Sequence, residues 1–315
     1  MKRNAYKGRN VKGLMQSQAK GINVIAIIAA LIIGILIGVG IGYPLWHSAT
    51  PQQTSYINKT ATPQQTSYIN KTATPQQTSY IDNIKARGKL ILGTSADWPP
   101  FEYVDKNGNF AGIDIEIARR IAQAIGVPLE VKDMQFSALI EAVKNGDVDI
   151  VLADMTPTSE REKVVDFSFP YYFASKGVVV TLKTSQISKL EDLYGKKVGV
   201  QLGTIQEDYA NQNLNGKAEI KTYDKVYPDM VMVLQRGDVD AIIIGEKIAA
   251  ALVTKNPDLK IAFTIGKPTA GAAVAMPKGA VDLKILVDKV IEDLINSGEM
   301  DQIFLNETLK WLGGS

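Results

Sequence analysis

The chain has 315 residues, enough for about two ordinary domains, and its 45% apolar and 22% charged residues are typical of a globular protein. It has no cysteine, which excludes disulfides, thiolate nucleophiles, lipid-modified cysteines and cysteine-based metal sites. Residues 1–81 carry eight Lys and Arg and no acid, so the rest of the chain is net acidic, which argues against a nucleic-acid partner.

The N-terminal end has the composition of a membrane anchor. Residues 1–20 contain six cations, and residues 21–46 are an apolar stretch in which Asn23 is the only strongly polar side chain. About 20 apolar residues let a helix cross a bilayer, and the preceding cations favour a cytoplasmic N-terminus. We therefore expect a single-pass helix in the cell membrane, with the rest of the chain on the extracytoplasmic face. A cleaved signal peptide is the alternative, and it exports the chain equally.

Residues 47–83 are expected to form a polar linker, because they consist largely of a short repeat. The twelve residues ATPQQTSYINKT occur twice between residues 49 and 72, and ATPQQTSYI follows. The period and the apolar content are too small for a stacked repeat fold, so the pattern indicates a flexible tether. Asn58 and Asn70 lie in glycosylation sequons, which are either modification sites of an exported segment or chance products of the repeat.

From residue 89 onward, short β-branched runs alternate with amphipathic helical stretches. The predicted strands are Lys89–Thr94, Leu129–Met134, Asp149–Ala153, Val178–Leu182, Lys197–Gln201, Ala218–Tyr223, Ala241–Ile244, Ile261–Ile265 and Ala272–Met276. The predicted helices are Ile115–Ile125, Ser137–Lys144, Ile205–Asn213, Met230–Arg236 and Lys247–Thr254. This alternation predicts an α/β fold of mainly parallel sheets flanked by helices, with ligand-binding loops after the carboxyl ends of the strands.

Four sequence blocks carry a family resemblance. They are GTSADWPPFEYVDKNGNFAGIDIEIARRIAQAIG, DVDIVLADMTPTSEREKVVDFSFPYY, KKVGVQLGTIQEDY and GDVDAIIIGE, which begin at Gly93, Asp147, Lys196 and Gly237. In this order and spacing they resemble the polar amino-acid-binding proteins of ABC importers, the solute-binding proteins of the family 3 type. The resemblance extends from about residue 84 to the end, and four blocks in order are far more specific than any one of them.

The resemblance implies a two-lobed periplasmic-binding-protein-like fold of type II. One lobe would comprise residues 84–177 and 268–315 and the other residues 178–267, with two crossover strands between them. The implied function is a receptor that captures a free amino acid, polar or basic, or an amino-acid-like solute between the lobes. It would deliver this solute to the permease and ATPase subunits of an ABC transporter.

The family pattern also assigns a carboxylate site and an aromatic clamp. Arg161 matches the arginine whose planar guanidinium binds the ligand carboxylate with two N–H groups. Thr156 and the backbone amide of Thr204, on opposite lobes, match its helpers. Trp98 and Phe136 match aromatic rings that pack on the aliphatic part of the solute, although an isolated aromatic residue more often belongs to a core.

Four further polar residues occupy positions that approach the ligand in the family. They are Ser95, Asp97, Asp154 and Gln201, each close to the end of a predicted strand. These residues either read a polar or cationic side chain of the ligand or cap turns of the backbone.

The chain departs from the family pattern at the ammonium site. Relatives have Asp or Glu directly after the run that here reads Asp240–Ile244, whereas this chain has Gly245 followed by Glu246. An ammonium group buried without a carboxylate is costly. Either Glu246 binds the ammonium through a shifted turn, which we favour, or the ligand has no conventional α-amino group.

We expect a binding role and not catalysis. His47 is the only histidine and lies beside the expected anchor, so the lobes contain no histidine-based triad, zinc site or general base, and we expect no metal and no cofactor. The alternatives from other classes are a carboxylate-based dehydratase resembling cyclohexadienyl dehydratases and the ligand-sensing domain of a receptor, which would need a separate output chain.

Overall fold

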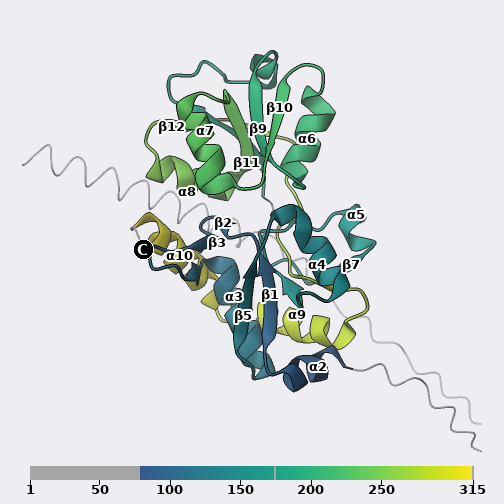
Figure 1. The fold of residues 1–315 in the computed structure, drawn as a ribbon. Helices are drawn as coiled ribbons and strands as arrows, with labels where there is room; N and C mark the ends of the chain where they lie inside the picture. The colour runs from purple at the N-terminus through teal and green to yellow at the C-terminus, as the bar shows by residue number, and fades with distance from the viewer. Residues whose placement is uncertain (1–78, 174, 314–315) are drawn as a thin grey trace, which may run out of the picture.

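The computed structural model describes residues 79–173 and 175–313, which form two α/β lobes, each around a five-stranded sheet (Figure 1). The first sheet has the order β5-β1-β6-β13-β7, with bounds Leu129–Asp133, Leu90–Thr94, Ile150–Val151, Ala275–Pro277 and Val165–Phe167. The second has the order β10-β9-β11-β8-β12, with bounds Glu219–Tyr223, Lys197–Gln201, Ala241–Gly245, Gly177–Leu182 and Leu259–Ile265. The first lobe therefore combines two separate stretches of the chain, and the second lobe uses the stretch between them.

Strand β1 shows why these sequences fold as buried strands. All five of its side chains are buried, and successive side chains point to opposite faces of the sheet. Leu90 and Leu92 pack in the core that contains helix α3 (Ile113–Ile125), whereas Ile91 packs with helix α4 (Leu139–Asn145). A strand covered on both faces reads as a continuous apolar run, so only the strand ends and their loops remain for a ligand.

Each helix packs one apolar face against these sheets. In α3, residues Ile113, Ile117 and Ile121 are fully buried at a spacing of four, which is the spacing of one helical face. The other helices are α2 (Tyr80–Arg87), α5 (Ser159–Glu162), α6 (Ile205–Leu214), α7 (Val231–Arg236), α8 (Glu246–Lys255), α9 (Val281–Asn296) and α10 (Glu299–Leu312). The five predicted helices correspond to α3, α4, α6, α7 and α8, and no end differs from its predicted position by more than two residues.

More strands pair antiparallel than the alternation of strands and helices in the sequence predicts. The triplets β5-β1-β6 and β10-β9-β11 are parallel. Strands β7, β8, β12 and β13, however, pair antiparallel with their neighbours. The chain leaves the first lobe between β7 and β8 and returns to it between β12 and β13. Because the two connections run in opposite directions, the strands at their ends pair antiparallel.

A small antiparallel sheet was not predicted. It consists of β2 (Asp97–Trp98), β3 (Glu102–Val104) and β4 (Phe110–Ala111). Each strand has only two or three residues, which is too short for a periodic pattern, and Pro99 and Pro100 interrupt the first connection. This sheet holds Trp98 directly after β1.

Helix α2 begins inside the segment 47–83 that we expected to be linker. Its first residue is Tyr80, because the Ser79 hydroxyl accepts a hydrogen bond from the Asp82 N–H at 3.0 Å and so caps the helix. The same hydroxyl donates to Asp282 of α9 at 2.6 Å. Residues 79–83 therefore pack with the first lobe, although they were expected to belong to the linker.

Two crossover segments, before β8 and after β12, run side by side in opposite directions between the lobes. Tyr171 N–H donates to Ala272 O at 2.9 Å, and Ala272 N–H donates to Tyr172 O at 2.9 Å. Farther along, Thr269 N–H donates to Ser175 O at 2.8 Å. This paired connection corresponds to the two crossover strands that the family resemblance implies, and it explains how one lobe interrupts the other in sequence.

Gly271 lets the two crossovers approach each other closely. Its φ is +100°, a conformation that other residues rarely adopt, and a Cβ built there would lie 1.8 Å from Tyr172 O. No side chain fits at that distance. The close approach of the two crossovers therefore requires glycine at this position.

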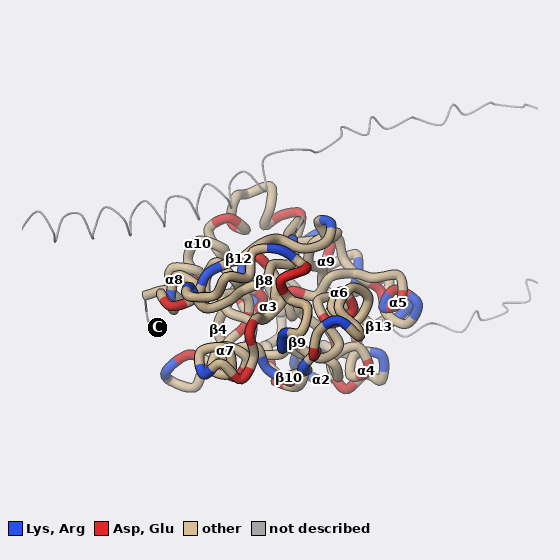
Figure 2. The backbone as a smooth tube through the Cα atoms, turned by 90° about the horizontal axis from the view of Figure 1, so that it is seen from above, with Lys and Arg blue, Asp and Glu red and all other residues tan. Residues whose placement is uncertain are grey.

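Among the helices of residues 79–173 and 175–313, none is both long and apolar enough to cross a bilayer. The expected anchor at 21–46 and nearly all of the repeat lie outside the described residues. Seen from above, Lys and Arg are interspersed with Asp and Glu along the described chain (Figure 2). Any strong electrostatic preference must therefore come from the local arrangement of a site.

Gly271→Ala should destabilise the protein much more than an ordinary glycine replacement. Gly216→Ala is the matched control, because Gly216 has a φ of +73° but a Cβ there meets no atom within 4 Å. The control should cost about 1 kcal/mol for its left-handed backbone, and Gly271→Ala about 2 kcal/mol more. Urea denaturation gives both free energies of unfolding, and equal losses would show that the crossovers are not constrained here.

Candidate functional site

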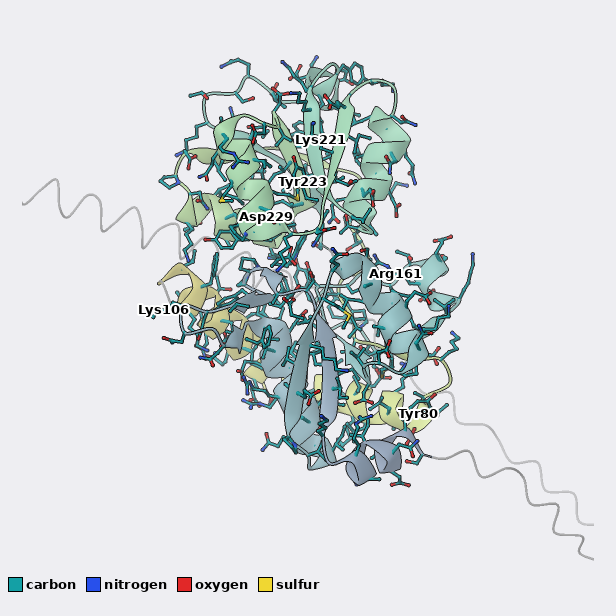
Figure 3. All side chains as sticks on the ribbon, viewed as in Figure 1. Tyr80, Lys106, Arg161, Lys221, Tyr223 and Asp229 are labelled. Carbon is teal, nitrogen blue, oxygen red and sulfur yellow. The ribbon has the colours of Figure 1, made fainter. Side chains whose placement is uncertain are left out.

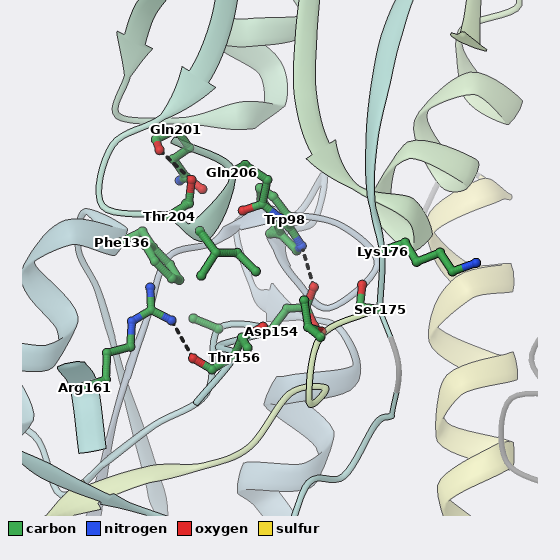
Figure 4. A pocket seen from close by; sticks show the side chains of 13 residues that line it. Trp98, Phe136, Asp154, Thr156, Arg161, Ser175, Lys176, Gln201, Thr204 and Gln206 are labelled. Atoms are coloured by element: carbon green, nitrogen blue, oxygen red, sulfur yellow. Dashed lines mark hydrogen bonds between the residues drawn. The ribbon is translucent and has the colours of Figure 1, made fainter. Parts of the chain in front are cut away.

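The candidate site is a cavity of about 440 Å³ between the lobes, a volume that includes its open mouth. The first lobe lines it with Trp98, Phe136, Ala153, Asp154, Thr156 and Arg161, the second with Gln201, Thr204, Ile205 and Gln206, and the crossovers with Ser175, Lys176 and Thr269 (Figure 4). Most of these residues follow the carboxyl ends of β1, β5, β6 or β9. The parallel strand ends of both lobes therefore face the same cavity.

Arg161 lies on the first lobe at the level of the cleft (Figure 3) and makes contacts to both lobes. Its Nη1 donates to Thr156 O at 2.7 Å, and its Nη2 donates to Gly203 O of the second lobe at 3.0 Å. The guanidinium carbon is 5.3 Å from the ring centre of Phe136. Burial lowers the pKa of Arg161, but a guanidinium stays protonated in proteins, so the cleft contains a fixed cation.

The turn after β9 brings backbone donors close to this guanidinium. Thr204 caps helix α6: its hydroxyl accepts from Glu207 N–H at 3.2 Å and donates to Gln201 O at 2.7 Å. A Cβ on Gly203 would lie 3.0 Å from Cα of Ser137, so the turn approaches the first lobe closely. The start of α6 and Arg161 together form a surface suited to an anion such as a carboxylate.

Asp154 forms the opposite, acidic part of the cavity. Its Oδ2 accepts from Trp98 Nε1 at 2.9 Å, and its backbone N–H donates to Asp114 Oδ2 at 2.8 Å. Its φ of +44° is a left-handed conformation that aspartate tolerates better than most residues. Burial and then the nearby charge of Asp114 raise the pKa of Asp154 well above its ordinary value.

Two further carboxyl groups are buried behind Asp154. Asp114 accepts from the hydroxyl of Tyr171 at 3.0 Å, and burial raises its pKa to about 6. Glu102 is completely desolvated, and burial together with Asp114 raises its pKa well above the usual range. Such a group of carboxyls in an apolar surrounding makes this wall of the cavity favourable for a cation.

Seven of the ten site residues expected from sequence line the cavity, but Ser95, Asp97 and Glu246 do not. Asp97 is buried behind Trp98 and accepts from Ser95 Oγ. Its other oxygen accepts from Gln201 Nε2 at 3.0 Å and from Val226 N–H at 2.5 Å, both in the second lobe. Asp97 therefore connects the two lobes and does not face the cavity.

Glu246 is the first residue of α8, and its N–H donates to Lys176 O at 2.8 Å. Its charge acts on Tyr172 and Lys247, neither of which lines the cavity. Gly245 is the residue that lies next to the cavity, since a Cβ there would be 3.4 Å from Trp98 Cζ2 and 3.8 Å from Asp154 Oδ2. Glu246 itself does not line the cavity.

Sequence reasoning missed the contribution of the crossovers. Ser175, Lys176 and Thr269 line the cavity but belong to segments with neither helical nor strand periodicity. Lys176 contributes mainly through its backbone, because its side chain points away from the other lining residues (Figure 4). Ile205 and Gln206 also line the cavity from the turn after β9, and the position of that turn at the end of a predicted strand was the signal that could have found them.

Comparison with known proteins identifies relatives for the described lobes. Residues 90–313 match the model of the bacterial extracellular solute-binding proteins, family 3. An arginine-binding extracellular protein of Bacillus subtilis is 40% identical over 72% of this chain and 87% of its own length. An L-cystine-binding protein of Escherichia coli is 31% identical over 74% and 85%. The crystal structure of an amino acid ABC transporter substrate-binding protein from Streptococcus pneumoniae bound to L-arginine has a TM-score of 0.70 and 37% identity, covering 73% of this chain and 99% of that one.

The pH dependence of stability should reveal the raised pKa of Asp97. Burial raises its pKa from 3.8 to about 6, so the folded state binds a proton that the unfolded state releases. The stabilisation from this proton is complete below about pH 4 and is lost as the pH rises through about 6. The free energy of unfolding of the wild type minus that of Asp97→Asn should therefore fall between pH 4 and pH 7.

Asp105→Asn is a control of opposite sign. Backbone hydrogen bonds from Asn109 and Asn107 lower the pKa of Asp105, so its contribution is present at neutral pH and lost as the pH falls. The corresponding difference for this variant should rise with pH. If the difference between the wild type and Asp97→Asn in free energy of unfolding stayed constant or rose with pH, it would contradict the buried position of Asp97 between the lobes.

Proposed function

The chain belongs to the bacterial extracellular solute-binding proteins, family 3, and on this basis we propose that it binds an α-amino acid between its lobes and delivers it to an ABC importer. L-arginine is the first candidate, because relatives from Bacillus subtilis and Streptococcus pneumoniae are described as arginine-binding or bound to L-arginine. The L-cystine-binding relative from Escherichia coli makes cystine the second. The role is that of a receptor, without chemistry on the solute.

The observation that carries this proposal is the position of Arg161 between the lobes. A guanidinium has five N–H donors, and two of them bond to the carbonyls of Thr156 and Gly203. The remaining donors and the amides at the start of α6 can bind the two oxygens of one carboxylate. A ligand bound in this way contacts both lobes, and therefore stabilises the closed arrangement.

Trp98 and Phe136 supply the apolar part of the proposed site. Both rings line the cavity, and Trp98 is only 7% exposed. Phe136 is fixed beneath the guanidinium of Arg161, and Trp98 is fixed by its hydrogen bond to Asp154. Rings held in this way contact the aliphatic part of an amino-acid side chain with little loss of conformational entropy on binding.

L-arginine should raise the melting temperature of the protein, and Arg161→Ala should remove most of that effect at the same ligand concentration. At a ligand concentration 1,000 times Kd the stabilisation is about 4 kcal/mol, or roughly 10 °C for a domain of this size. Loss of the buried guanidinium should weaken binding on the order of 100-fold. Lys163→Ala, at an exposed position two residues away, should leave the shift unchanged.

A thermal-shift screen of the common amino acids measures this directly. Stabilisation by another amino acid would change the identity of the ligand and leave the site intact. The proposal fails if no amino acid stabilises the wild type, or if Arg161→Ala responds as the wild type does.

We also propose that residues 21–46 anchor the chain in the membrane and that the repeat after them is a tether. The family is extracellular, which supports export of the lobes, and the apolar length with its preceding cations supports a retained helix. A chain without cysteine has no site for a lipid-modified cysteine, so a helix is the anchor that its sequence allows.

Cell fractionation tests the anchor. The full chain should sediment with membranes and resist extraction by high salt, because apolar contacts are not screened by ions. A variant lacking residues 1–46 behind a cleavable signal peptide should be released in soluble form. Recovery of the full-length chain in the soluble exported fraction, shortened by its first 46 to 49 residues, would indicate a cleaved signal peptide instead.

A further inference from the structure

An α-amino acid bound at Arg161 also brings an ammonium group into the cleft, and this group needs a counter-charge. Among the described side chains that line the cavity, Asp154 is the one carboxylate. We propose that Asp154 of the first lobe binds the α-ammonium of the solute, in space that Gly245 of the second lobe leaves open. The inference rests on the proposed function, because it assigns a further contact of the same ligand.

The carboxylate of Asp154 is already positioned for this contact. Both hydrogen bonds that fix the residue, from Trp98 Nε1 to Oδ2 and from its own N–H to Asp114, leave Oδ1 without a donor in the described part of the chain. Asp154 and Arg161 belong to the same segment between β6 and β7, seven residues apart. Figure 4 shows them on the same lobe, with Thr156 between them.

The backbone does not require glycine at position 245. Its φ of −68° and ψ of 148° are accessible to any residue, and as the N-cap of α8 the position favours Asp, Asn or Ser. What distinguishes glycine here is the absent side chain. A Cβ would stand 3.8 Å from Asp154 Oδ2, so a carboxylate at 245 and one at 154 would occupy neighbouring positions and repel each other.

The surroundings of Asp154 favour a cationic partner over a neutral one. Asp114 and Glu102 do not line the cavity, and no Lys or Arg among the described residues makes an ion pair with any of the three carboxyls. Burial raises the pKa of Asp154, which means that its charged form lacks compensation in the ligand-free cleft. An ammonium at Oδ1 would supply this compensation.

The assignment has a consequence for the order of events in binding. With Arg161 and Asp154 on one segment, the first lobe alone holds both charged ends of the amino acid. The second lobe then adds the amides at the start of α6 and the side chain of Gln201 as it closes. Recognition of the zwitterion thus precedes closure, and closure completes the contacts.

The test compares L-arginine with 5-guanidinopentanoate, which keeps the carboxylate and the guanidinium but lacks the α-amino group. Isothermal titration on the full chain in detergent gives Kd for both probes. Asp154→Asn should weaken L-arginine binding on the order of 100-fold and change the affinity for 5-guanidinopentanoate by less than about twofold. Asparagine keeps the shape of the side chain and tolerates the left-handed backbone at this position.

Gly245→Asp provides the complementary variant. In the Asp154→Asn background it should restore at least about tenfold of the lost L-arginine affinity, because the carboxylate returns to the same space from the other lobe. In the wild-type background it should not improve binding, because two carboxylates repel each other there. Glu246→Gln is the control one residue away, and its Kd for L-arginine should equal that of the wild type.

The possible failures are distinguishable. If Asp154→Asn weakens the binding of both probes equally, Asp154 contacts the side chain of the ligand and the inference is wrong. If it weakens the binding of neither probe, Asp154 does not contact the ligand and the inference is also wrong. Loss of affinity in Glu246→Gln would return the ammonium site to Glu246. Failure of the wild type to bind any amino acid would overturn the proposed function itself. If the wild type prefers another amino acid, that amino acid and its des-amino counterpart replace the two probes.

Discussion

The guanidinium of Arg161 is the interaction on which the rest of the site depends, because it contacts both lobes at once. It reaches the second lobe only because Gly203 lets the turn after β9 approach the first lobe closely. That approach depends in turn on the paired crossovers, whose spacing requires Gly271. A fixed cation between the two lobes is a suitable partner for an anion that would hold them together.

Opposite this cation, Asp154 lines the cavity, and two further carboxyl groups, of Glu102 and Asp114, are buried behind it. Buried acids without cationic partners are unfavourable for stability, and Glu102, Asp114 and Asp154 all have raised pKa values for this reason. Perturbed groups of this kind gather at functional sites. With a cation on one side and acids on the other, the cavity has the charge distribution that a zwitterion complements, and Trp98 and Phe136 cover the apolar part between them.

Much of this arrangement was predictable from the sequence. Strand β9 has the predicted bounds, and α6 and α8 differ from prediction by no more than one residue at their ends. The residues after β1, β5, β6 and β9 meet in one cavity because parallel strands end at a common edge. The two-lobed fold was predicted through the family resemblance alone, since periodicity carries no information on how the chain returns to the first lobe.

The remaining features depend on contacts between distant residues. Asp97 bonds to Val226, 129 residues away, so nothing local distinguished a residue that joins the lobes from one that touches ligand. The role of Gly245 depends on where Asp154 lies in the opposite lobe, and the strands β2 to β4 are too short for any periodic signal. Helix α2 was hidden because its first residues continue the repeat, and only the contact of Ser79 with Asp282 makes them part of the lobe.

A crystal structure of the protein with L-arginine tests the central claim most directly. The account predicts that the ligand carboxylate lies within about 3 Å of the guanidinium of Arg161 and of an amide at the start of α6, with the α-ammonium within about 3 Å of Asp154 Oδ1. A carboxylate bound elsewhere in the cleft, or an ammonium bound to Glu246, would contradict it.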